Sequence, residues 1–491
     1  MIGRTKTAIL LLALPVCALA RDEYTRTFDK TVTLQPGQKF RLEHSLGDIE
    51  IHTHPSRDVV IHADIKASAS NANDAKSFAD KIAVLVENSA GMLAVRTKYP
   101  ERPSSFFGSN NISYTVHYSI TVPETAPVEI QNSFGAVEAS GLKAGSDIRT
   151  SHGTLTFRNG RGTQRLLDSF ANVEVSNNEG DVQLEDSNGA VTVSDVSGLL
   201  NLRNRFGAVN VSRVGRGATV TNSNGAVHLT DVSGDSLVNN SFGEVTATGL
   251  QGKLSVNNSN GKVDANNIKG AATLNTSFGS VHFSNIGGPA SVTATNSSVE
   301  GQNTGGPLNL QSSFGAIAVG EIHGSAEIKG SNGAVTVTNI DGQTNIHNSF
   351  GLVRAENTGP LTVHNSNASV RASGIRGDAA VDTSFGAVLL DGITGAITVG
   401  NQNGAVEATS TAKGACRPIE IHTSFSAIRL HLPGDASYRL SAKTSFGKIS
   451  SALPISTSGS LSSDSISGTI GHGQCELRLT NNNGDISILN H

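Results

Sequence analysis

The sequence has no tryptophan, and aromatic residues make up only 4% of its 491 residues. A globular core of ordinary size uses more large side chains, so we expect a thin core of Val, Ile, Leu and Ala. No stretch after residue 20 is long and apolar enough to cross a bilayer, so we expect no transmembrane helix. Without residues 1–20 the net charge is −6 and no basic block remains, which argues against nucleic acid as a partner.

Cysteine is scarce as well, with three in the chain. Two of them, Cys416 and Cys475, are candidates for a disulfide if the protein is exported. On a regular stack of coils they would lie about three coils, or ~14 Å, apart, which exceeds the reach of a disulfide. The bridge therefore requires the end of the chain to fold back, and the sequence is compatible with both the bonded and the free state.

Residues 1–20 have the features of a secretory signal peptide. Arg4 and Lys6 give a basic start, an apolar run follows over residues 8–14, and the segment ends in Ala-Leu-Ala with cleavage expected after Ala20. Cys17 raises the question of a lipid anchor, but lipoprotein signals place a small residue where this chain has Val16. We therefore expect an exported protein that is periplasmic, on the outer surface or secreted, and not a lipoprotein.

One short phrase, Ser-Phe-Gly-x-Val or Ser-Asn-Gly-x-Val, dominates the rest of the chain. The slot filled by Phe or Asn in this phrase is called position 0 here. It recurs sixteen times between Phe134 and Asn403, with fourteen steps of 18 residues and one of 17. Phenylalanine fills it at Phe134, Phe170, Phe206, Phe242, Phe278, Phe314, Phe350 and Phe385, with Asn or His152 at the slots between them. Further copies follow at longer steps at Phe425 and Phe446.

The columns of this repeat predict the fold. Position 1 is usually Gly, apolar residues recur at positions 3, 5, 8 and 14, and no segment has helical spacing. One repeat cannot bury its apolar side alone, so each forms a coil of two or three short strands that stacks on its neighbours. The chain therefore predicts an all-β, single-chain parallel β-solenoid of about 18-residue coils, with right-handed coils favoured over left-handed ones.

Four segments follow from the same reading: a signal peptide (1–20), irregular N-terminal β coils with a cap (21–132), the regular solenoid (133–408), and longer coils with a C-terminal cap (409–491). The N-terminal segment predicts one helix, over 71–81. Alternating apolar and polar residues predict its strands, which we expect at 31–34, 48–52, 58–65, 82–86 and 112–122.

Three motifs together resemble a known family. Gly-Asp-Ile-Glu-Ile occurs at 47–51, Tyr-x-Ile-x-Val-Pro at 118–123, and coils of Ser-Phe/Asn-Gly-x-Val follow. This chain is similar over roughly residues 30–491 to the bacterial putative-adhesin β-solenoid family, a domain of unknown function. The resemblance implies a parallel β-solenoid in an exported protein and brings no catalytic residues with it.

Two interpretations of the phenylalanines at position 0 compete. In the favoured one the rings pack at a corner of the core, because large Phe and small Asn alternate as facing core layers do. In the other, the rings form an exposed stripe that binds a glycan or another envelope polymer. Strand alternation favours exposure, since inward positions 3 and 5 place position 0 outward, but a bulge at the position-1 glycine would reverse that.

The remaining columns favour structural roles. The Ser before position 0 is expected to bond turn backbone, because no copy pairs it with a His and an acid at fixed positions. Position 4 mixes charged and neutral residues, as a solvated strand face does. The cluster of Glu50, His52, His54 and His62 is more typical of a polar strand face than of a metal site. We therefore predict no catalytic, cofactor-binding or metal-binding residues.

These observations favour an exported, non-enzymatic, envelope-associated adhesion or scaffold protein that binds through a long repetitive face. A cell-envelope glycan or a surface protein would be its partner, and the sequence predicts no oligomeric state. Two alternatives stay open: a self-associating structural rod, and a β-helix lyase or hydrolase acting on polysaccharide.

Overall fold

The computed structural model describes residues 21–101, 112–412, 416–457 and 462–491. The described chain is a parallel β-solenoid of about 17 turns with coils of about 18 residues, which confirms the predicted fold class. The preference for right-handed coils stays a prediction, and the expected signal peptide lies outside the described residues. The chain divides into two compact units, residues 1–157 and 158–491.

The first unit combines antiparallel and parallel pairing in two sheets. Its strands are β1 (Asp22–Thr33), β2 (Lys39–Glu43), β3 (Ile49–His54), β4 (Asp58–Ala69), β5 (Ala83–Ser89), β6 (Met92–Lys98), β7 (Ser113–Pro123), β8 (Val128–Gln131), β9 (Val137–Ser140) and β10 (Ser146–Arg149). In one sheet β1, β4 and β7 pair antiparallel, and β3 then pairs parallel with both β7 and β9. In the other, β5 and β6 form a hairpin, and parallel pairing runs from β6 through β2 and β8 to β10. The five expected strands overlap β1, β3, β4, β5 and β7, whereas β2, β6 and β8 were not predicted.

The expected helix is present as α1 (Ala72–Ala79), which packs against β1 and β4. Asn71 caps its start, since the Asn71 side chain accepts a hydrogen bond of 2.9 Å from the backbone N–H of Asp74. Its apolar side is small, with Ala75 and Ala79 buried. From β1, the Arg26 guanidinium donates to the carbonyl oxygen of Ala79 and ties the end of the helix to the sheet.

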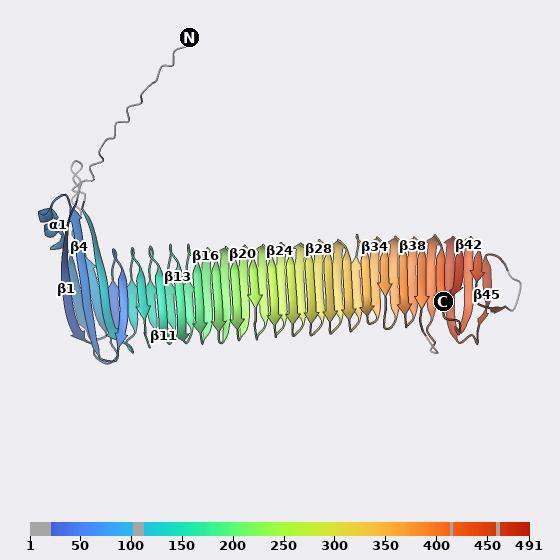
Figure 1. Ribbon diagram of the computed structural model, residues 1–491, viewed down its shortest axis with the longest axis horizontal. Helices are drawn as coiled ribbons and strands as arrows, with labels where there is room; N and C mark the ends of the chain where they lie inside the picture. Colours follow the sequence, from blue (N-terminus) through green and yellow to red (C-terminus); the bar gives the residue numbers. More distant parts are fainter. Residues whose placement is uncertain (1–20, 102–111, 413–415, 458–461) are drawn as a thin grey trace, which may run out of the picture. The chain divides into compact units, whose positions relative to one another are not determined.

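Each coil of the second unit contributes one strand to each of two parallel sheets (Figure 1). Sheet A contains β13 (Val173–Glu179), β15 (Val191–Val196), β17 (Val209–Val214), β19 (Val227–Val232), β21 (Val245–Thr248), β23 (Val263–Ile268), β25 (Val281–Ile286), β27 (Val299–Thr304), β29 (Ile317–Ile322), β31 (Val335–Ile340), β33 (Val353–Thr358), β35 (Val370–Ser373), β37 (Val388–Ile393), β39 (Val406–Ser410), β41 (Ile428–Leu432), β43 (Ile449–Ser451) and β47 (Ile486–Asn490). Sheet B contains β12 (Gln164–Leu167), β14 (Val182–Glu185), β16 (Leu199–Phe206), β18 (Gly217–Asn224), β20 (Asp235–Phe242), β22 (Leu254–Asn260), β24 (Ala272–Phe278), β26 (Ala290–Asn296), β28 (Leu308–Phe314), β30 (Ala326–Asn332), β32 (Thr344–Asn348), β34 (Leu361–Asn367), β36 (Ala379–Phe385), β38 (Ile397–Asn403), β40 (Ile419–Phe425), β42 (Tyr438–Phe446), β44 (Ile455–Thr457), β45 (Ser465–Ile470) and β46 (Cys475–Asn483). The strand β11 (Leu155–Arg161) spans the boundary between the two units.

The apolar columns of the repeat line the space between the two sheets. In β17, Val209, Val211 and Val214 at positions 3, 5 and 8 are all buried. A spacing of three between the last two breaks strict alternation, and the reason is the residue at position 7. Arg213 there has a φ of 54°, and the non-glycine residues at this position in other coils have φ values within a few degrees of it, so the chain bends and position 8 points inward again.

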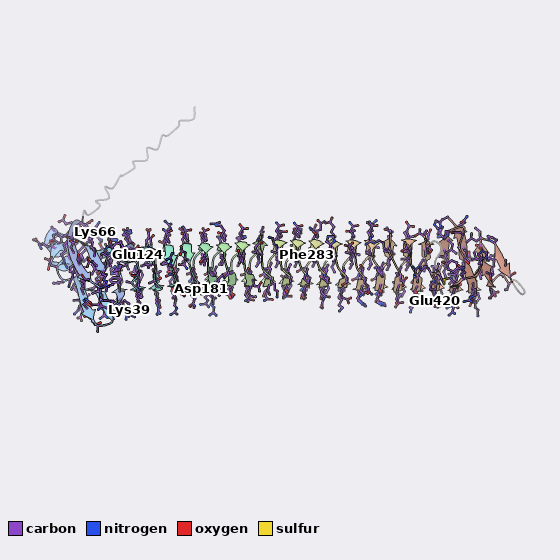
Figure 2. The ribbon with its side chains drawn as sticks, turned by 90° about the horizontal axis from the view of Figure 1, so that it is seen from below. Lys39, Lys66, Glu124, Asp181, Phe283 and Glu420 are labelled. Atoms are coloured by element: carbon purple, nitrogen blue, oxygen red, sulfur yellow. A yellow bond between two sulfur atoms is a disulfide. The ribbon has the colours of Figure 1, made fainter. Side chains whose placement is uncertain are left out.

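The core is thin enough that one large ring must be matched by a small neighbour. Phe283 at position 5 of its coil is fully buried between the sheets (Figure 2). The equivalent residue of the next coil is Gly301, where an added Cβ would lie 2.0 Å from the Phe283 ring. The large ring of one coil is therefore matched by the smallest residue in the next coil, as dense packing requires.

The last coil of the chain lies between two earlier coils. Its sheet-B strand β46 pairs in parallel with β40 on one side and with β42 on the other. Its sheet-A strand β47 lies between β41 and β43 in the same way. The chain thus passes outward through β42 and β43, forms the antiparallel strands β44 and β45, and returns to fill the gap.

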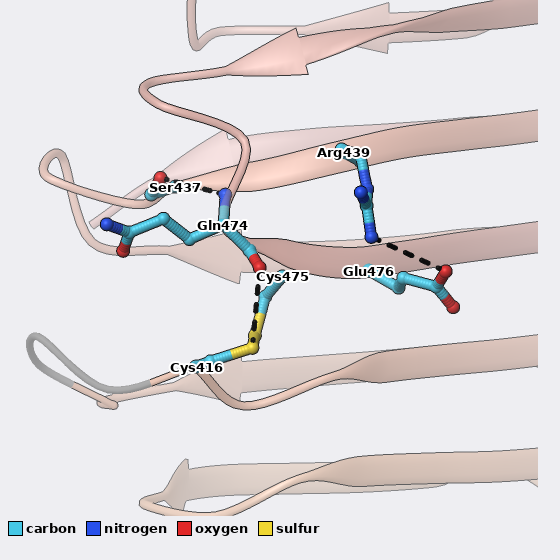
Figure 3. Close-up of a disulfide and its surroundings, with 6 residues drawn as sticks. All are labelled: Cys416, Ser437, Arg439, Gln474, Cys475 and Glu476. Atoms are coloured by element: carbon cyan, nitrogen blue, oxygen red, sulfur yellow. Dashed lines mark hydrogen bonds and ion pairs between the residues drawn. A yellow bond between two sulfur atoms is a disulfide. The ribbon is translucent and has the colours of Figure 1, made fainter.

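This return brings the two cysteines together. Cys416 and Cys475, 59 residues apart in sequence, form a disulfide with their Cα atoms 5.2 Å apart (Figure 3). The separation of three coils expected on a regular stack does not arise, because β46 occupies the position next to β40. The disulfide therefore fixes the start of the inserted coil to the segment that precedes β40.

Candidate binding face

The phenylalanine rings at position 0 are exposed to solvent. In the second unit Phe206 is 49% exposed, Phe242 is 55% exposed and Phe446 reaches 74%. The exposed rings of this unit are Phe170, Phe206, Phe242, Phe278, Phe314, Phe350, Phe385, Phe425 and Phe446. In the first unit Phe134 is 49% exposed and stacks on His152 with ring centroids 4.6 Å apart. The favoured prediction, that these rings pack in the core, is therefore wrong.

The rings face outward because the chain turns a corner between sheets B and A at this point. In β18, Val220 and Asn222 are buried, whereas both Ser223 and the position-0 residue Asn224 are partly exposed. Gly225 at position 1 then turns the chain with a φ of 141°, a conformation that glycine adopts most easily. An added Cβ on Gly225 would lie 2.1 Å from the carbonyl oxygen of Gly207 in the adjacent coil, so no ring fits between the coils here.

Phe and Asn alternate in space even where they do not alternate in sequence. Position 0 is Phe in two successive copies, at Phe425 and Phe446. The inserted last coil places Asn483 in register with both of them. The spatial order is therefore Phe425, Asn483, Phe446, and the exposed rings stay two coils apart, about 9.6 Å at the usual strand spacing.

The asparagines at position 0 hold the turn of one coil to the next. Asn188 donates from Nδ2 to the carbonyl oxygen of Ser169 at 3.2 Å, and Asn260 donates to that of Ser241 at 3.4 Å. The Ser column thus supplies backbone acceptors to these amides, while the side chain of Ser241 faces the surface. Asn is short enough to bond back in this way, which leaves the neighbouring rings as the projecting groups.

A shallow polar groove runs beside the rings on the outer face of sheet B. One stretch has a volume of about 560 Å³, and its lining includes Thr221, Asn239, Asn257, Asn275 and Thr293 from five successive coils. The amides form a ladder, since Asn257 Nδ2 donates to Asn239 Oδ1 and Asn275 Nδ2 donates to Asn257 Oδ1, both at 2.9 Å. Ser241 and Ser277, which also line the groove, directly precede exposed rings.

A second stretch of about 290 Å³ contains titratable side chains at the same outward position. His347 and His364 stack on adjacent coils with ring centroids 4.9 Å apart, and His364 Nδ1 lies 3.8 Å from Asp382 Oδ2 in the next coil. The two stretches therefore share a position in the coil but differ in chemistry.

A buried polar column, which was not predicted from the sequence, borders the groove from inside. It lies two residues before position 0, where Asn222 and Asn240 are 2% and 5% exposed. Asn222 Nδ2 donates to the carbonyl oxygens of Gly207 and Gly225, both at 3.2 Å, and so ties the glycine turns of adjacent coils together. The sequence does repeat Asn, Thr or Asp at this position, which could have indicated a buried polar column, but such residues are equally typical of turns.

Asp168 and Asp186 occupy this buried column in two successive coils. Burial raises the pKa of Asp168 to about 6, and it raises the pKa of Asp186 as well. Asp168 Oδ2 accepts a hydrogen bond of 2.8 Å from the backbone N–H of Ala171, whereas its Oδ1 is buried with no partner. An ionised Asp here cannot donate to the carbonyl oxygens that Asn222 satisfies.

The other candidate residues form local pairs. At position 4, Glu174 pairs with Arg158 at 3.1 Å and His282 lies 3.8 Å from Glu300. The Glu50, His52, His54 and His62 group does not converge. His52 lies 3.6 Å from Glu50, His54 Nε2 lies 2.6 Å from the carbonyl oxygen of Asp58, and His62 pairs with Asp29 at 2.7 Å.

The described residues contain neither a metal-ligand cluster nor a membrane-spanning helix. No group of three or more His, Cys, Asp and Glu side chains there is arranged to hold a metal ion. Within the same residues, no helix has the length and hydrophobicity needed to span a bilayer.

A protein-family model described as Toastrack DUF4097 matches residues 46–300 and 308–489. The chain belongs to the Toastrack family. The match includes the two early motifs and the repeated coils, so the resemblance seen in the sequence is confirmed. No curated protein matches this Toastrack chain.

Two solved structures are similar to parts of this Toastrack chain. A "putative cell adhesion protein" from Clostridium sporogenes is 9% identical, with 95% of this chain and 100% of that chain covered and a TM-score of 0.14. A "putative adhesin" from Bacteroides fragilis is 12% identical, with 64% of this chain and 97% of that chain covered and a TM-score of 0.17.

Proposed function

We propose that this protein is an exported, non-enzymatic, envelope-associated adhesion or scaffold protein that binds through the exposed rings at position 0 and the groove beside them. The observation that carries the proposal is the exposure of a Phe ring at every second coil of the second unit. Exposed aromatic side chains contribute little to folding and favour unwanted association, so a row of them points to an interaction surface. We name this row and the adjacent groove the binding face.

The repetition supports binding by many weak contacts. Covering the exposed half of one Phe ring is worth about 1 kcal/mol, which alone gives no useful affinity. Several rings that engage one extended or repetitive partner act together, because each further contact becomes intramolecular. The binding face therefore suits a long polymer or a crowded surface better than a small molecule.

Export is proposed from the signal-like residues 1–20, and the disulfide supports it. Bonds such as that between Cys416 and Cys475 persist in oxidising compartments and are rare in the cytosol.

The fold at the C-terminal end supports binding along the side of the solenoid over end-to-end stacking of two chains. The outermost strands there, β43 and β44, have three residues each, and short edge strands offer few groups for pairing with another chain.

The proposal is tested with residues 21–491 and an envelope fraction from the source cell. Replacing Phe206, Phe242 and Phe278 by Ser should weaken binding at least tenfold, because three adjacent contacts are lost. The matched control replaces Asn224, Asn260 and Asn296 by Ser, which changes the same column and spares every ring. Absence of binding by the wild type, or equal binding by the Phe variant and the wild type, would contradict the proposal.

A further inference from the structure

We propose that the middle of the binding face takes an uncharged, extended, β-linked polysaccharide, which lies along the outer face of sheet B between residues 219 and 313 and occupies the groove there. This inference rests on the function proposed above and adds the chemical class of the partner. Three features carry it: the absence of charge on this part of the face, the order of its polar side chains, and the spacing of its rings.

In these coils, the three outward side chains of sheet B that lie nearest to position 0 carry no charge. Each strand presents three of them before its position-0 residue, for example Thr273, Asn275 and Ser277 in β24. The full set is Thr219, Thr221, Ser223, Leu237, Asn239, Ser241, Ser255, Asn257, Ser259, Thr273, Asn275, Ser277, Ser291, Thr293, Thr295, Asn309, Gln311 and Ser313.

Charged residues border this set on both sides along the sheet. Arg203 and Arg205 precede it, and Glu327 and Lys329 follow it. Asp235 and Lys253 lie at or before the starts of their strands, at the far end from the rings. A charged polymer would find no opposite charge on this surface, so an uncharged partner is the better match.

The polar groups of the groove suit sugar hydroxyls. Hydroxyl and amide groups both donate and accept hydrogen bonds, and a pyranose presents the same mixture around its rim. The ladder from Asn239 through Asn257 to Asn275 fixes these amides before a ligand arrives, which lowers the entropic cost of binding. The groove volume of about 560 Å³ lies within the usual range for ligand sites.

The rings supply the apolar part of such a site. Phe242, Phe278 and Phe314 end alternate strands and are 55%, 53% and 53% exposed. In an extended β-linked chain each sugar is turned over relative to the last, so the same sugar face returns at every second residue. The two-coil spacing of the rings, about 9.6 Å, is close to one such disaccharide step.

An extended peptide fits this surface less well. Peptides that bind sheets usually add a strand at an unpaired edge. The strands β20, β22, β24 and β26 are each paired in parallel on both sides, so they offer no edge. Only side chains remain for recognition here, as in the binding of a sugar chain.

Affinity electrophoresis of residues 21–491 tests the proposal, with hydroxyethyl cellulose or glycol chitin as uncharged polymers and polygalacturonate as a charged one. We expect the uncharged polymers to retard the wild type and polygalacturonate not to. Replacing Asn257 and Asn275 by Ala should weaken the retardation roughly tenfold, because two fixed amides are lost from the groove. The matched control replaces Thr192 and Thr336 by Ala on the outer face of sheet A, and it should behave as the wild type.

Retardation by polygalacturonate alone, retardation by none of the polymers, or equal retardation of the Asn257→Ala/Asn275→Ala variant and the wild type would overturn the proposal. The envelope-binding experiment separates this failure from failure of the proposed function. If the polymers give a contradicting result but envelope binding still depends on the rings, the proposed function holds and its target is not a neutral glycan. If envelope binding is also absent or independent of the rings, the proposed function is wrong as well.

Discussion

A phenylalanine at position 0 adds less to folding than a buried one. About half of the Phe206 side chain stays in water, so it contributes about 1 kcal/mol rather than the 1.5–3 kcal/mol of a fully buried ring. The glycine beside it is under a stricter constraint, because the turns of adjacent coils touch at Gly207 and Gly225. At residue scale, therefore, the small residue of the phrase maintains the fold and the large one is available to a partner.

The buried Asp168 gives a prediction about pH. Its pKa is raised to about 6, whereas a carboxyl in the unfolded chain titrates near 3.8. The folded state therefore holds an extra proton between about pH 4 and pH 6, and its stability falls as the pH rises through this interval. Asp168→Asn should remove that fall, because Asn can donate to turn carbonyl oxygens as Asn222 does, and should stabilise the coil by about 1 kcal/mol at pH 7.

Hydrogen exchange in β12 and β14 at pH 4.5 and pH 7.5 measures this effect locally. Because burial raises the pKa of Asp186 too, Asp168→Asn/Asp186→Asn is the companion variant and should be less pH-dependent than either single one. Wild-type protection that is greater at pH 7.5 than at pH 4.5 would show that the sign is wrong.

Residue patterns predicted the inward columns but not the outward and polar ones. Val at positions 3, 5 and 8 can only be core, and the structure buries all three in β17. Asn222 was missed because Asn occurs both in turns and at buried positions where its amide group donates to backbone carbonyl oxygens. The rings were assigned to the core because Phe and Asn alternate in size as facing core layers do. Strand alternation did favour exposure, but a bulge at the position-1 glycine would have reversed it.

At the scale of elements, the repeat predicts each coil but not the order of the coils in space. Parallel pairing between successive coils follows from the 18-residue step, and it holds as far as β40. The step then lengthens, and β46 pairs between β40 and β42. Nothing in a periodic pattern specifies this insertion, whereas the two cysteines required it if they were to be bonded.

The disulfide is therefore expected to stabilise one element, the inserted last coil. Cys416→Ser/Cys475→Ser should lower its stability by up to about 4 kcal/mol, the loop-entropy value for a link that spans 59 residues. Hydrogen exchange should show faster exchange in β46, β47 and the strands beyond them, with little change in β20 to β34, because coils contact only their neighbours. Equal loss of protection along the whole array, or none near β46, would contradict this account.

At the scale of the whole molecule, activity is expected to depend on the number of exposed rings rather than on any one of them. The insertion of Asn483 between Phe425 and Phe446 keeps the rings at alternate coils to the end of the array. Such a surface binds through many weak contacts that act together. Single substitutions should therefore lower the affinity little, and multiple substitutions should lower it strongly. Stability should follow the core columns instead, since those hold the coils together.

The central claim, that the rings at position 0 serve binding rather than packing, is tested most directly by a graded series in residues 21–491. One, three and five of Phe206, Phe242, Phe278, Phe314 and Phe350 are replaced by Ser, and envelope binding and the melting temperature are measured on each variant. We predict that affinity falls stepwise, by roughly tenfold or more at the third substitution, while the melting temperature stays close to that of the wild type. A melting temperature that falls with each substitution while binding per folded molecule is unchanged would contradict the claim.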